Sequence, residues 1–256
     1  MRINVGVDMS IDHERFDAAK EMIIGKNRER VGIGTLSEKT MHAVLKHYYA
    51  PDVSMHEIPM ESYVADIYTG TEIIEIQTRA MNRMRKKLES FLALYPVTIV
   101  YPIPRQKWLY WIDEETGELS DKRKSPKKGN PYQAFIELYK IRPFLSHPNL
   151  RLRLALIDME EYRLLNGWSR DKKKGSERFD RIPLSFVEEV CIDSYKDYMQ
   201  LIHYDLPERF TTKDFAKYAK IPTRLAGTVL LILYDLKLVD RVSKQGNSYV
   251  YEVCDF

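Results

Sequence analysis

One short stretch of this chain constrains its fold more than any other, because it is typical of a β-hairpin. Residues 64–77 read VADIYTGTEIIEIQ, with two apolar, β-branched runs on either side of Thr69-Gly70. This pair is typical of the turn that joins two antiparallel strands. An acid, Asp66, lies near the end of the first predicted strand. The stretch therefore predicts two neighbouring strands in one sheet.

The second strand of this hairpin has one apolar and one polar face. Side chains two apart on a strand point the same way, so Glu75 and Gln77 project together, and Ile74 and Ile76 point toward a core. Carboxylates that converge from two neighbouring strands can hold a hard divalent cation such as Mg²⁺, so Asp66 and Glu75 are candidate metal ligands. The alternative interpretation is that these polar side chains lie on the solvated face of an ordinary hairpin.

The net charge of the chain is less informative about its binding partners than the distribution of basic residues along the sequence. The chain has 256 residues with 40 basic and 37 acidic side chains, a net charge of 40 − 37 = +3, which does not by itself indicate a polyanionic partner. Basic residues are nevertheless concentrated at 122–128 and 172–174, and on the predicted helix that follows the hairpin. Such runs are usually solvated. Together with a candidate phosphoesterase site, they favour contact with a nucleic-acid backbone.

Cysteine usage and hydropathy favour a cytoplasmic protein. Cys191 and Cys254 are far apart and form no metal-binding or disulfide pattern. The first residues lack the pattern of a signal peptide, and no apolar run reaches the ~20 residues that a membrane-spanning helix needs. We therefore expect no membrane partner.

Apolar residues make up 44% of the chain, and their spacing predicts the order of elements around the hairpin. Helical spacing marks residues 38–49, for which Ser37 is a candidate N-cap, and residues 80–94. The predicted order is a helix (38–49), three strands (54–60, 62–68, 72–77), a helix (80–94) and a buried strand (97–103). Residues 113–131 read as a charged loop, 150–158 as a further strand, and 170–181 as a second charged loop around a possible strand pair.

The last 60 or so residues have a different pattern. Three helices are predicted at 195–203, 211–220 and 223–236, followed by strands at 239–243 and 248–253 around Gly246. This order predicts a small winged helix-turn-helix domain. The predicted organisation is an N-terminal extension (1–30), a larger domain (31–192) and the winged helix (193–256).

The hairpin and its neighbours resemble the PD-(D/E)XK, or restriction-endonuclease-like, nuclease superfamily. Asp66 matches the first acid of that motif and Glu75 the second, while Gln77 stands where the common pattern has Lys, as in the E-x-Q variant. The resemblance implies an α+β fold with an αβββαβ core and a mixed sheet. It also implies an Mg²⁺ or Mn²⁺ ion bound by Asp66, Glu75, the carbonyl of Ile76 and the helical acid Glu38. In that scheme Gln77 completes the catalytic set by orienting water.

Gln77 carries no charge, so a cation is expected from elsewhere. The candidates are Lys46, Arg79, Arg83 and Lys107. Glu38, His42 and Lys46 follow one another at i, i+4 and i+8, so they form one polar stripe on a helix. That stripe either faces the two acids, with His42 as an accessory group, or is an exposed helix face.

Two further sets of residues are candidates for contact with nucleic acid. One is in the winged helix, at the start of its last helix and in the wing, where recognition helices and wings approach DNA. The other is in the basic run before residue 130. The candidates are Thr223, Arg224, Lys244, Gln245, Lys124 and Lys127. The aromatic residues Trp108, Tyr110 and Trp111 either stack on bases or pack in the core.

These expectations combine into a metal-dependent nuclease that hydrolyses DNA phosphodiester bonds. The alternative is a non-catalytic DNA-binding or regulatory protein on the same scaffold, which the missing motif Lys favours. A protein-interaction adaptor that binds neither metal nor DNA is a third class. RNA as a substrate and a homodimer are both compatible with the sequence.

Overall fold

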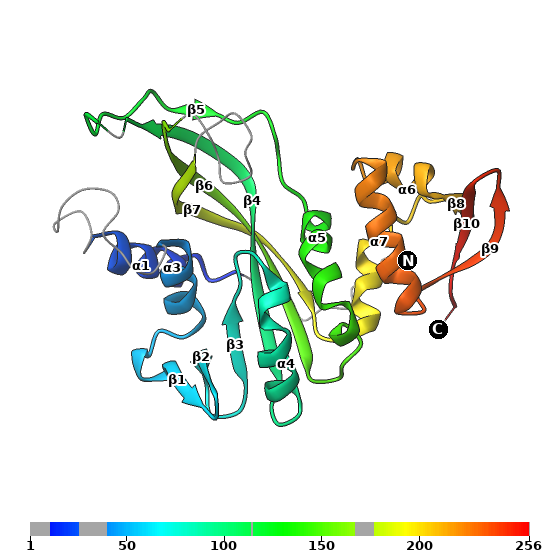
Figure 1. Cartoon of the computed structure of the whole chain (residues 1–256), viewed down its shortest axis with the longest axis horizontal. Coiled ribbons are helices and arrows are strands. Elements are labelled where there is room, and N and C mark those ends of the chain that lie inside the picture. Colours follow the sequence, from blue (N-terminus) through cyan, green and yellow to red (C-terminus); the bar gives the residue numbers. More distant parts are fainter. Residues whose placement is uncertain (1–10, 26–39, 114, 167–176, 256) are drawn as a thin grey trace.

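The structure is a computed structural model that describes residues 11–25, 40–113, 115–166 and 177–255. Glu38, Ser37 and the basic run 172–174 lie outside the described residues. The described chain is of the α+β class, with a large mixed sheet and a smaller antiparallel sheet (Figure 1).

The large sheet contains seven strands among the described residues, in the order β1-β2-β3-β4-β6-β7, with β5 paired to β4. Strand β3 is parallel to β4 and β4 is parallel to β6, while the other pairs are antiparallel, so the sheet is mixed. The strands are β1 (His56–Met60), β2 (Tyr63–Tyr68), β3 (Ile73–Ile76), β4 (Val97–Ile112), β5 (Arg123–Lys124), β6 (Leu150–Leu164) and β7 (Glu177–Ile192).

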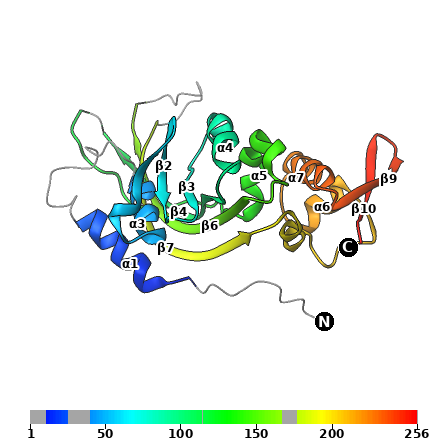
Figure 2. The same ribbon diagram turned by 90° about the horizontal axis from the view of Figure 1, so that it is seen from below.

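Helices cover both faces of this sheet (Figures 1 and 2). One face carries α1 (His13–Lys20), its π-helical continuation Glu21–Gly25 and α3 (Thr40–Tyr49), around a buried cluster that includes Ile74 and Ile76. The other face carries α4 and α5, around a second cluster that includes Ile73 and Ile99. Their bounds are α4 (Arg85–Leu92), preceded by a 3₁₀ turn (Met81–Met84), and α5 (Phe135–Leu138), between 3₁₀ segments Pro131–Ala134 and Tyr139–Phe144.

The hairpin lies where the sequence predicts it. Gly70 adopts a φ of +92°, which glycine reaches at little steric cost, and the Thr69 N–H donates to the Glu72 carbonyl at 3.1 Å. Ile74 and Ile76 are 6% and 2% exposed, as their alternation predicts. The predicted order of helix, three strands, helix and strand is also the order of α3, β1, β2, β3, α4 and β4.

The long strands of the sheet differ from the prediction. Strand β4 continues to Ile112 instead of ending at 103, β6 continues to Leu164, and β7 begins at Glu177 inside a predicted loop. Charged residues of β4 beyond the predicted end of the strand are matched across the ladder, since Arg105 donates to Asp158 at 2.6 and 2.7 Å. Pairing of β4 with β6 as far as Ile112 therefore extends β4 beyond its predicted end at residue 103.

The C-terminal elements follow the predicted order with two differences. The first predicted helix is a 3₁₀ segment, Tyr195–Leu201, and a short strand β8 precedes α6. Thr211 caps α6, because its hydroxyl accepts from the Asp214 N–H while the Asp214 carboxylate accepts from the Thr211 N–H. The elements are β8 (Arg209–Thr211), α6 (Thr212–Tyr218), α7 (Thr223–Asp235), β9 (Val239–Gln245) and β10 (Ser248–Val253), with strand order β8-β10-β9.

The C-terminal elements pack against the helical layer of the large sheet. Helix α7 contacts α5, and one apolar cluster runs continuously from Phe135 through Tyr198 to Leu230. Arg142 pairs with Asp235 of α7 at 3.1 Å. Independent folding of residues 193–256 stays a prediction.

Candidate active site

The candidate site lies where β2 and β3 separate. Their backbone ladder ends at the pair Ile67 and Ile74, so Asp66 and Glu75 would be the next partners in this register. Instead, the Asp66 N–H donates to Glu75 Oε1 at 3.2 Å, and the Ile76 N–H donates to Asp66 Oδ2 at 2.8 Å. Each carboxylate thus satisfies a backbone donor of the opposite strand, which brings the two acids together.

The two acids have different electrostatic environments. Burial and the charge of Asp66 raise the pKa of Glu75 to about 7, against the lowering effect of the Lys87 ammonium. Burial also raises the pKa of Asp66, but the hydrogen bond and charge of His42, with the Ile76 N–H, outweigh it and leave the pKa below its usual value. One carboxylate is therefore ionised at neutral pH while its neighbour is poised near its titration point, a pattern common at functional sites.

Helix α3 contributes one of its predicted residues to this site. His42 Nε2 lies 3.2 Å from Asp66 Oδ2, so the polar stripe of α3 does reach the acids at this position. Lys46, one turn further along, is 5% exposed and pairs with Glu57 of β1, and its role as the cation of the site stays a prediction. The helix turns Lys46 toward β1 because that strand lies beside its last turn.

Helix α4 supplies a cation that the sequence analysis missed. Lys87 Nζ donates to Glu75 Oε2 at 2.6 Å. It places a positive charge beside Glu75 from a neighbouring helix. A signal was available, because Lys87 lies three residues after buried Met84 and four before buried Phe91, which turns it toward the sheet.

The other predicted cations lie outside hydrogen-bonding reach of the two acids. Arg79 and Arg83 are exposed after β3, and the Gln77 amide donates to the Arg79 carbonyl. Lys107 pairs with Glu161 of β6 at 3.2 Å instead of with Asp66 or Glu75. The structure thus brings together Asp66, Glu75, His42 and Lys87.

The donor set can be compared with what a divalent cation needs. In the part of the chain that the structure describes, no three His, Cys, Asp or Glu side chains gather as a metal site, and Glu38 lies outside that part. Two mutually repelling carboxylates beside the backbone of Ile76 nevertheless fit Mg²⁺, which commonly takes one or two carboxylates and completes its shell with water and substrate phosphate.

The predicted nucleic-acid contacts are surface residues at separate places. Thr223 and Arg224 are exposed on the first turn of α7, whereas Val229, Leu230 and Leu233 further along are buried. Lys244 and Gln245 are exposed beside Gly246, at the tip of the β9–β10 hairpin. In the other region, Lys124 lies on β5, 5.8 Å from the Trp108 ring centroid, and Lys127 is exposed. Trp108, Tyr110 and Trp111 belong to β4.

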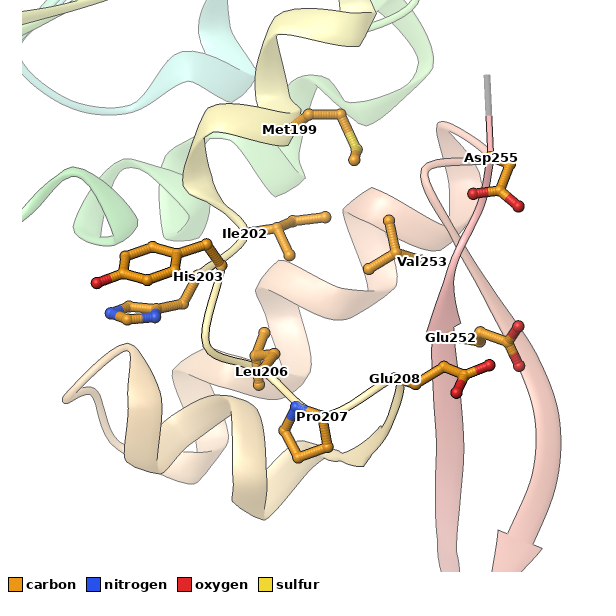
Figure 3. A pocket seen from close by; sticks show the side chains of 10 residues that line it. Met199, Ile202, His203, Leu206, Pro207, Glu208, Glu252, Val253 and Asp255 are labelled. Carbon is orange, nitrogen blue, oxygen red and sulfur yellow. The ribbon is translucent and has the colours of Figure 1, made fainter. Parts of the chain in front are cut away.

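A pocket of about 410 Å³ lies away from the acids, among the C-terminal elements (Figure 3). Met199, Ile202 and Val253 form its apolar part, and Glu208 and Glu252 lie at its edge. Glu252 also pairs with Arg209 at 3.4 Å. The pocket contains no part of the β2–β3 site.

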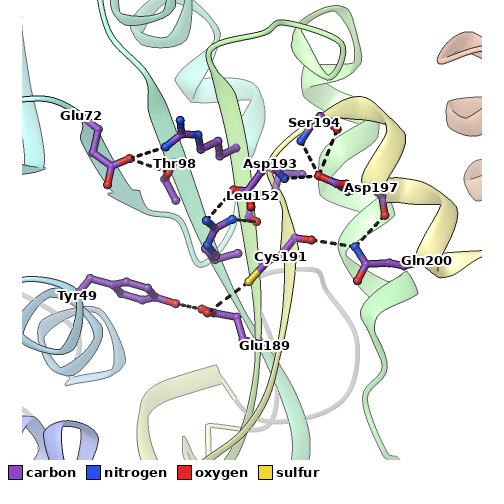
Figure 4. A network of polar contacts seen from close by, with 12 residues as sticks. Tyr49, Glu72, Thr98, Leu152, Glu189, Cys191, Asp193, Ser194, Asp197 and Gln200 are labelled. Carbon is purple, nitrogen blue, oxygen red and sulfur yellow. Dashed lines mark hydrogen bonds and ion pairs between the residues drawn. The ribbon is translucent and has the colours of Figure 1, made fainter. Parts of the chain in front are cut away.

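A polar network at the start of β6 and the end of β7 contains one of the two cysteines (Figure 4). Cys191 Sγ lies 3.7 Å from Glu189 Oε2, and Tyr49 donates to the other oxygen of that carboxylate. Burial, against the lowering charge of Arg153, raises the pKa of Cys191 to about 11. A thiol that stays protonated is a poor nucleophile, so this network does not support cysteine catalysis.

The comparisons with known proteins concern the region that carries these acids. Residues 39–193, more than half of the chain, match a family model described as Domain of unknown function (DUF8091). The chain belongs to the DUF8091 family. The DUF8091 region runs from the start of α3 to the end of β7 and contains all four residues of the site.

One relative extends beyond this region. An uncharacterized protein of Treponema pallidum (strain Nichols) is 27% identical over 226 residues, which cover 86% of each chain. No solved structure matches the chain. No helix among the described residues is both long and apolar enough to cross a membrane.

Proposed function

We propose that this DUF8091 protein is an Mg²⁺- or Mn²⁺-dependent nuclease that hydrolyses phosphodiester bonds of DNA. The observation that carries the proposal is the convergence of Asp66, Glu75 and Lys87 where two strands of a mixed sheet separate. A buried acid, a half-buried acid and an amine are groups that metal-dependent phosphodiester cleavage can use.

The arrangement of elements supports the same proposal. Helix α3, strands β1–β3, helix α4 and strand β4 follow the αβββαβ order, and the acids are on the second and third strands. We infer a restriction-endonuclease-like core from this agreement. The α6–α7 pair with the sheet β8-β10-β9 similarly supports a winged helix, in which Thr223, Arg224, Lys244 and Gln245 would contact DNA.

The carboxylates would hold the metal ion. Asp66 and Glu75 would each provide an oxygen, with the Ile76 carbonyl as a third donor. A metal bound there would lower the pKa of a coordinated water and shield the charge that develops on the phosphate. His42 keeps Asp66 ionised and fixes its orientation, as its 3.2 Å contact and the lowered Asp66 pKa support.

Lys87 would take the part that Lys plays at the Gln77 position in the common motif. Its ammonium contacts Glu75 Oε2, and a short rotation of this flexible side chain would turn it toward a bound phosphate. Its positive charge would there stabilise the developing negative charge of the transition state. Gln77 has no charge, so its role would be to orient water.

One observation favours the alternative of a non-catalytic DNA-binding or regulatory protein. Lys87 already neutralises Glu75 at 2.6 Å, so an ion pair could replace the metal instead of assisting it. In that case the site would be a structural remnant, and DNA binding would occur without cleavage.

Cleavage of plasmid and single-stranded DNA with Mg²⁺ or Mn²⁺ tests the proposal. We expect metal-dependent cleavage by the wild type, loss of cleavage in Asp66→Ala and Glu75→Ala, and retention in Glu89→Ala, which removes an exposed glutamate of α4. DNA binding without cleavage across both substrates and both metals would refute the nuclease and support the regulatory alternative.

A further inference from the structure

A second cluster of charges surrounds Glu161 on β6. Its carboxylate is fully buried, at 0% exposure, and no other acid pairs with the same cations among the described residues. Lys107 Nζ lies 3.2 Å from both of its oxygens, Arg163 Nε donates at 2.9 Å, and Arg181 Nε, from the cross-strand partner on β7, donates at 2.9 Å. One carboxylate thus holds three cations.

Two more guanidinium groups add to the positive charge. Arg178 is the cross-strand partner of Arg163, and its pKa responds to the charges of Arg181, Arg79 and Glu161. Neither Arg178 nor Arg79 forms an ion pair with any of the described acids. These six residues, Arg79, Lys107, Arg163, Arg178 and Arg181 with Glu161, have a net charge of 5 − 1 = +4. We call these six residues the Glu161 cluster.

The Glu161 cluster begins next to the candidate active site. Arg79 follows Gln77 by two residues, where the chain leaves β3. Burial and the charge of Glu137 raise the pKa of Tyr101, one residue past the β4 partner of Ile76, against the lowering charges of Arg181 and Arg178. The cluster therefore extends from the open end of β3 across β4 to the β6–β7 ladder.

A purely structural ion network is the simpler explanation, but it does not account for the excess of cations. One buried carboxylate needs one or two cations to offset its desolvation, and further cations repel one another. Desolvation, with the charges of Arg181 and Arg163, lowers the pKa of Lys107 against the raising effect of Glu161. Arg178 is exposed, yet desolvation by the surrounding groups and the charges of Arg181 and Arg79 lower its pKa to about 10. This repulsion would be relieved by an anion from outside the chain.

We propose that the Glu161 cluster binds backbone phosphates of the nucleic-acid strand whose scissile bond lies at Asp66 and Glu75. The proposal deepens the nuclease assignment and rests on it for the position of the scissile bond. Guanidinium groups match phosphate because they donate two parallel hydrogen bonds. The buried Glu161 would hold Lys107, Arg163 and Arg181 in fixed positions, while Arg79 and Arg178 remain available at the surface.

The test is salt-dependent binding of a DNA duplex of about 20 base pairs, long enough for several phosphate contacts, measured by fluorescence anisotropy in EDTA so that no cleavage occurs. The variants are Arg178→Gln and Arg79→Gln, which remove exposed charges and leave the three pairs of Glu161 in place. The matched control is Arg151→Gln, the same charge change at the opposite end of β6, where Arg151 pairs with Glu72 at 3.3 Å. Thermal unfolding checks that each variant is folded.

Each cluster variant should reduce the slope of log K against log salt by about one, which weakens binding about tenfold at 0.1 M salt relative to 1 M. The control should leave the slope unchanged. Equal slopes in all four proteins would overturn the proposal. Weaker binding of inorganic phosphate by the cluster variants, with unchanged DNA binding, would overturn it in favour of a small-anion site.

The two proposals can fail separately. If the wild type cleaves no DNA but the cluster variants bind duplex more weakly than the control, the Glu161 cluster is a nucleic-acid site and the nuclease assignment is wrong. If the wild type cleaves and the cluster variants bind like the control, the nuclease stands and the Glu161 cluster has no part in binding.

Discussion

Replacement of Glu75 by Gln should make the metal-free protein more stable at alkaline pH. The pKa of Glu75 is raised from 4.5 to about 7 by burial and by Asp66, so the folded protein binds this proton more tightly than the unfolded chain. A raised pKa stabilises the fold fully below the unfolded value of 4.5, and this contribution is lost as pH rises through 7. The neutral amide of the Glu75→Gln variant mimics the protonated acid and avoids the loss.

The size of the effect follows from the shift. The difference between 4.5 and about 7 corresponds to about 3 kcal/mol, since each pKa unit is worth about 1.4 kcal/mol. No discount for solvent screening is needed, because Glu75 is only 3% exposed. Glu75→Gln should therefore gain up to about 3 kcal/mol in free energy of unfolding at about pH 8.5 and almost nothing at about pH 4.5.

Urea unfolding of the wild type and Glu75→Gln in EDTA at both pH values measures this difference, with Glu89→Gln as the control for loss of an exposed carboxylate. Added Mn²⁺ should reverse the order at the alkaline pH, because it stabilises only a protein that can bind it, by about 4.1 kcal/mol at about 1,000 times Kd. A variant that is less stable than the wild type in EDTA at alkaline pH would refute the reasoning, since Glu75 would then be stabilising in its ionised form.

Three further predictions concern Lys87, Glu161 and two glycines. Lys87→Met should lower the rate of plasmid nicking by about 10²- to 10³-fold, and Lys87→Arg should lower it less, since Lys87 is the cation beside Glu75. Equal rates in Lys87→Met and the wild type would show that Lys87 has no part in cleavage. Glu161→Gln should cost about 3 kcal/mol at neutral pH, because burial of Glu161 is outweighed by Arg181 and Lys107, which lower its pKa from 4.5 to about 2. Its contribution is present above pH 4.5 and lost as pH falls through 2, so the difference between urea unfolding curves should shrink toward pH 2; a difference that is constant with pH would contradict this origin. Gly129→Ala should cost about 1–3 kcal/mol in thermal unfolding, because its Cβ would meet the Pro104 carbonyl oxygen at 2.1 Å. The control is Gly227→Ala in α7, where the nearest atom is 3.9 Å away, and it should be neutral or stabilising by up to about 1 kcal/mol. Equal melting temperatures of the two variants would show that the approach at Gly129 is not tight.

Local patterns were enough to predict the elements around the hairpin. Alternation over 72–77 and helical spacing over 38–49 depend on neighbours in sequence, so they predict β3 and α3 within a few residues. The contact of Asp66 with Glu75 was predictable for the same reason, since a two-stranded hairpin leaves little freedom of register.

Contacts between distant strands could not be predicted in this way. The predicted strand ends at residue 103, whereas β4 continues, because the charges of Arg105 and Lys107 are matched by Asp158 and Glu161, more than fifty positions later. The single sequence contains no information on that pairing. The Glu161 cluster was missed for the same reason, because its members come from β4, β6, β7 and the segment after β3.

Lys87 shows how folding and the candidate chemistry depend on the same residues. Burial of Met84, Leu88 and Phe91 determines which side of α4 faces the sheet, and this rotation places Lys87 over Glu75. What matters for the site is the position of the amine in space, not in the sequence. The residue two positions after Glu75 is Gln77, whereas the Lys87 Nζ that contacts Glu75 comes from α4. The packing of α4 thus performs the positioning that a strand lysine would obtain from its own backbone, which explains how an E-x-Q sequence can still present two acids and an amine at one point.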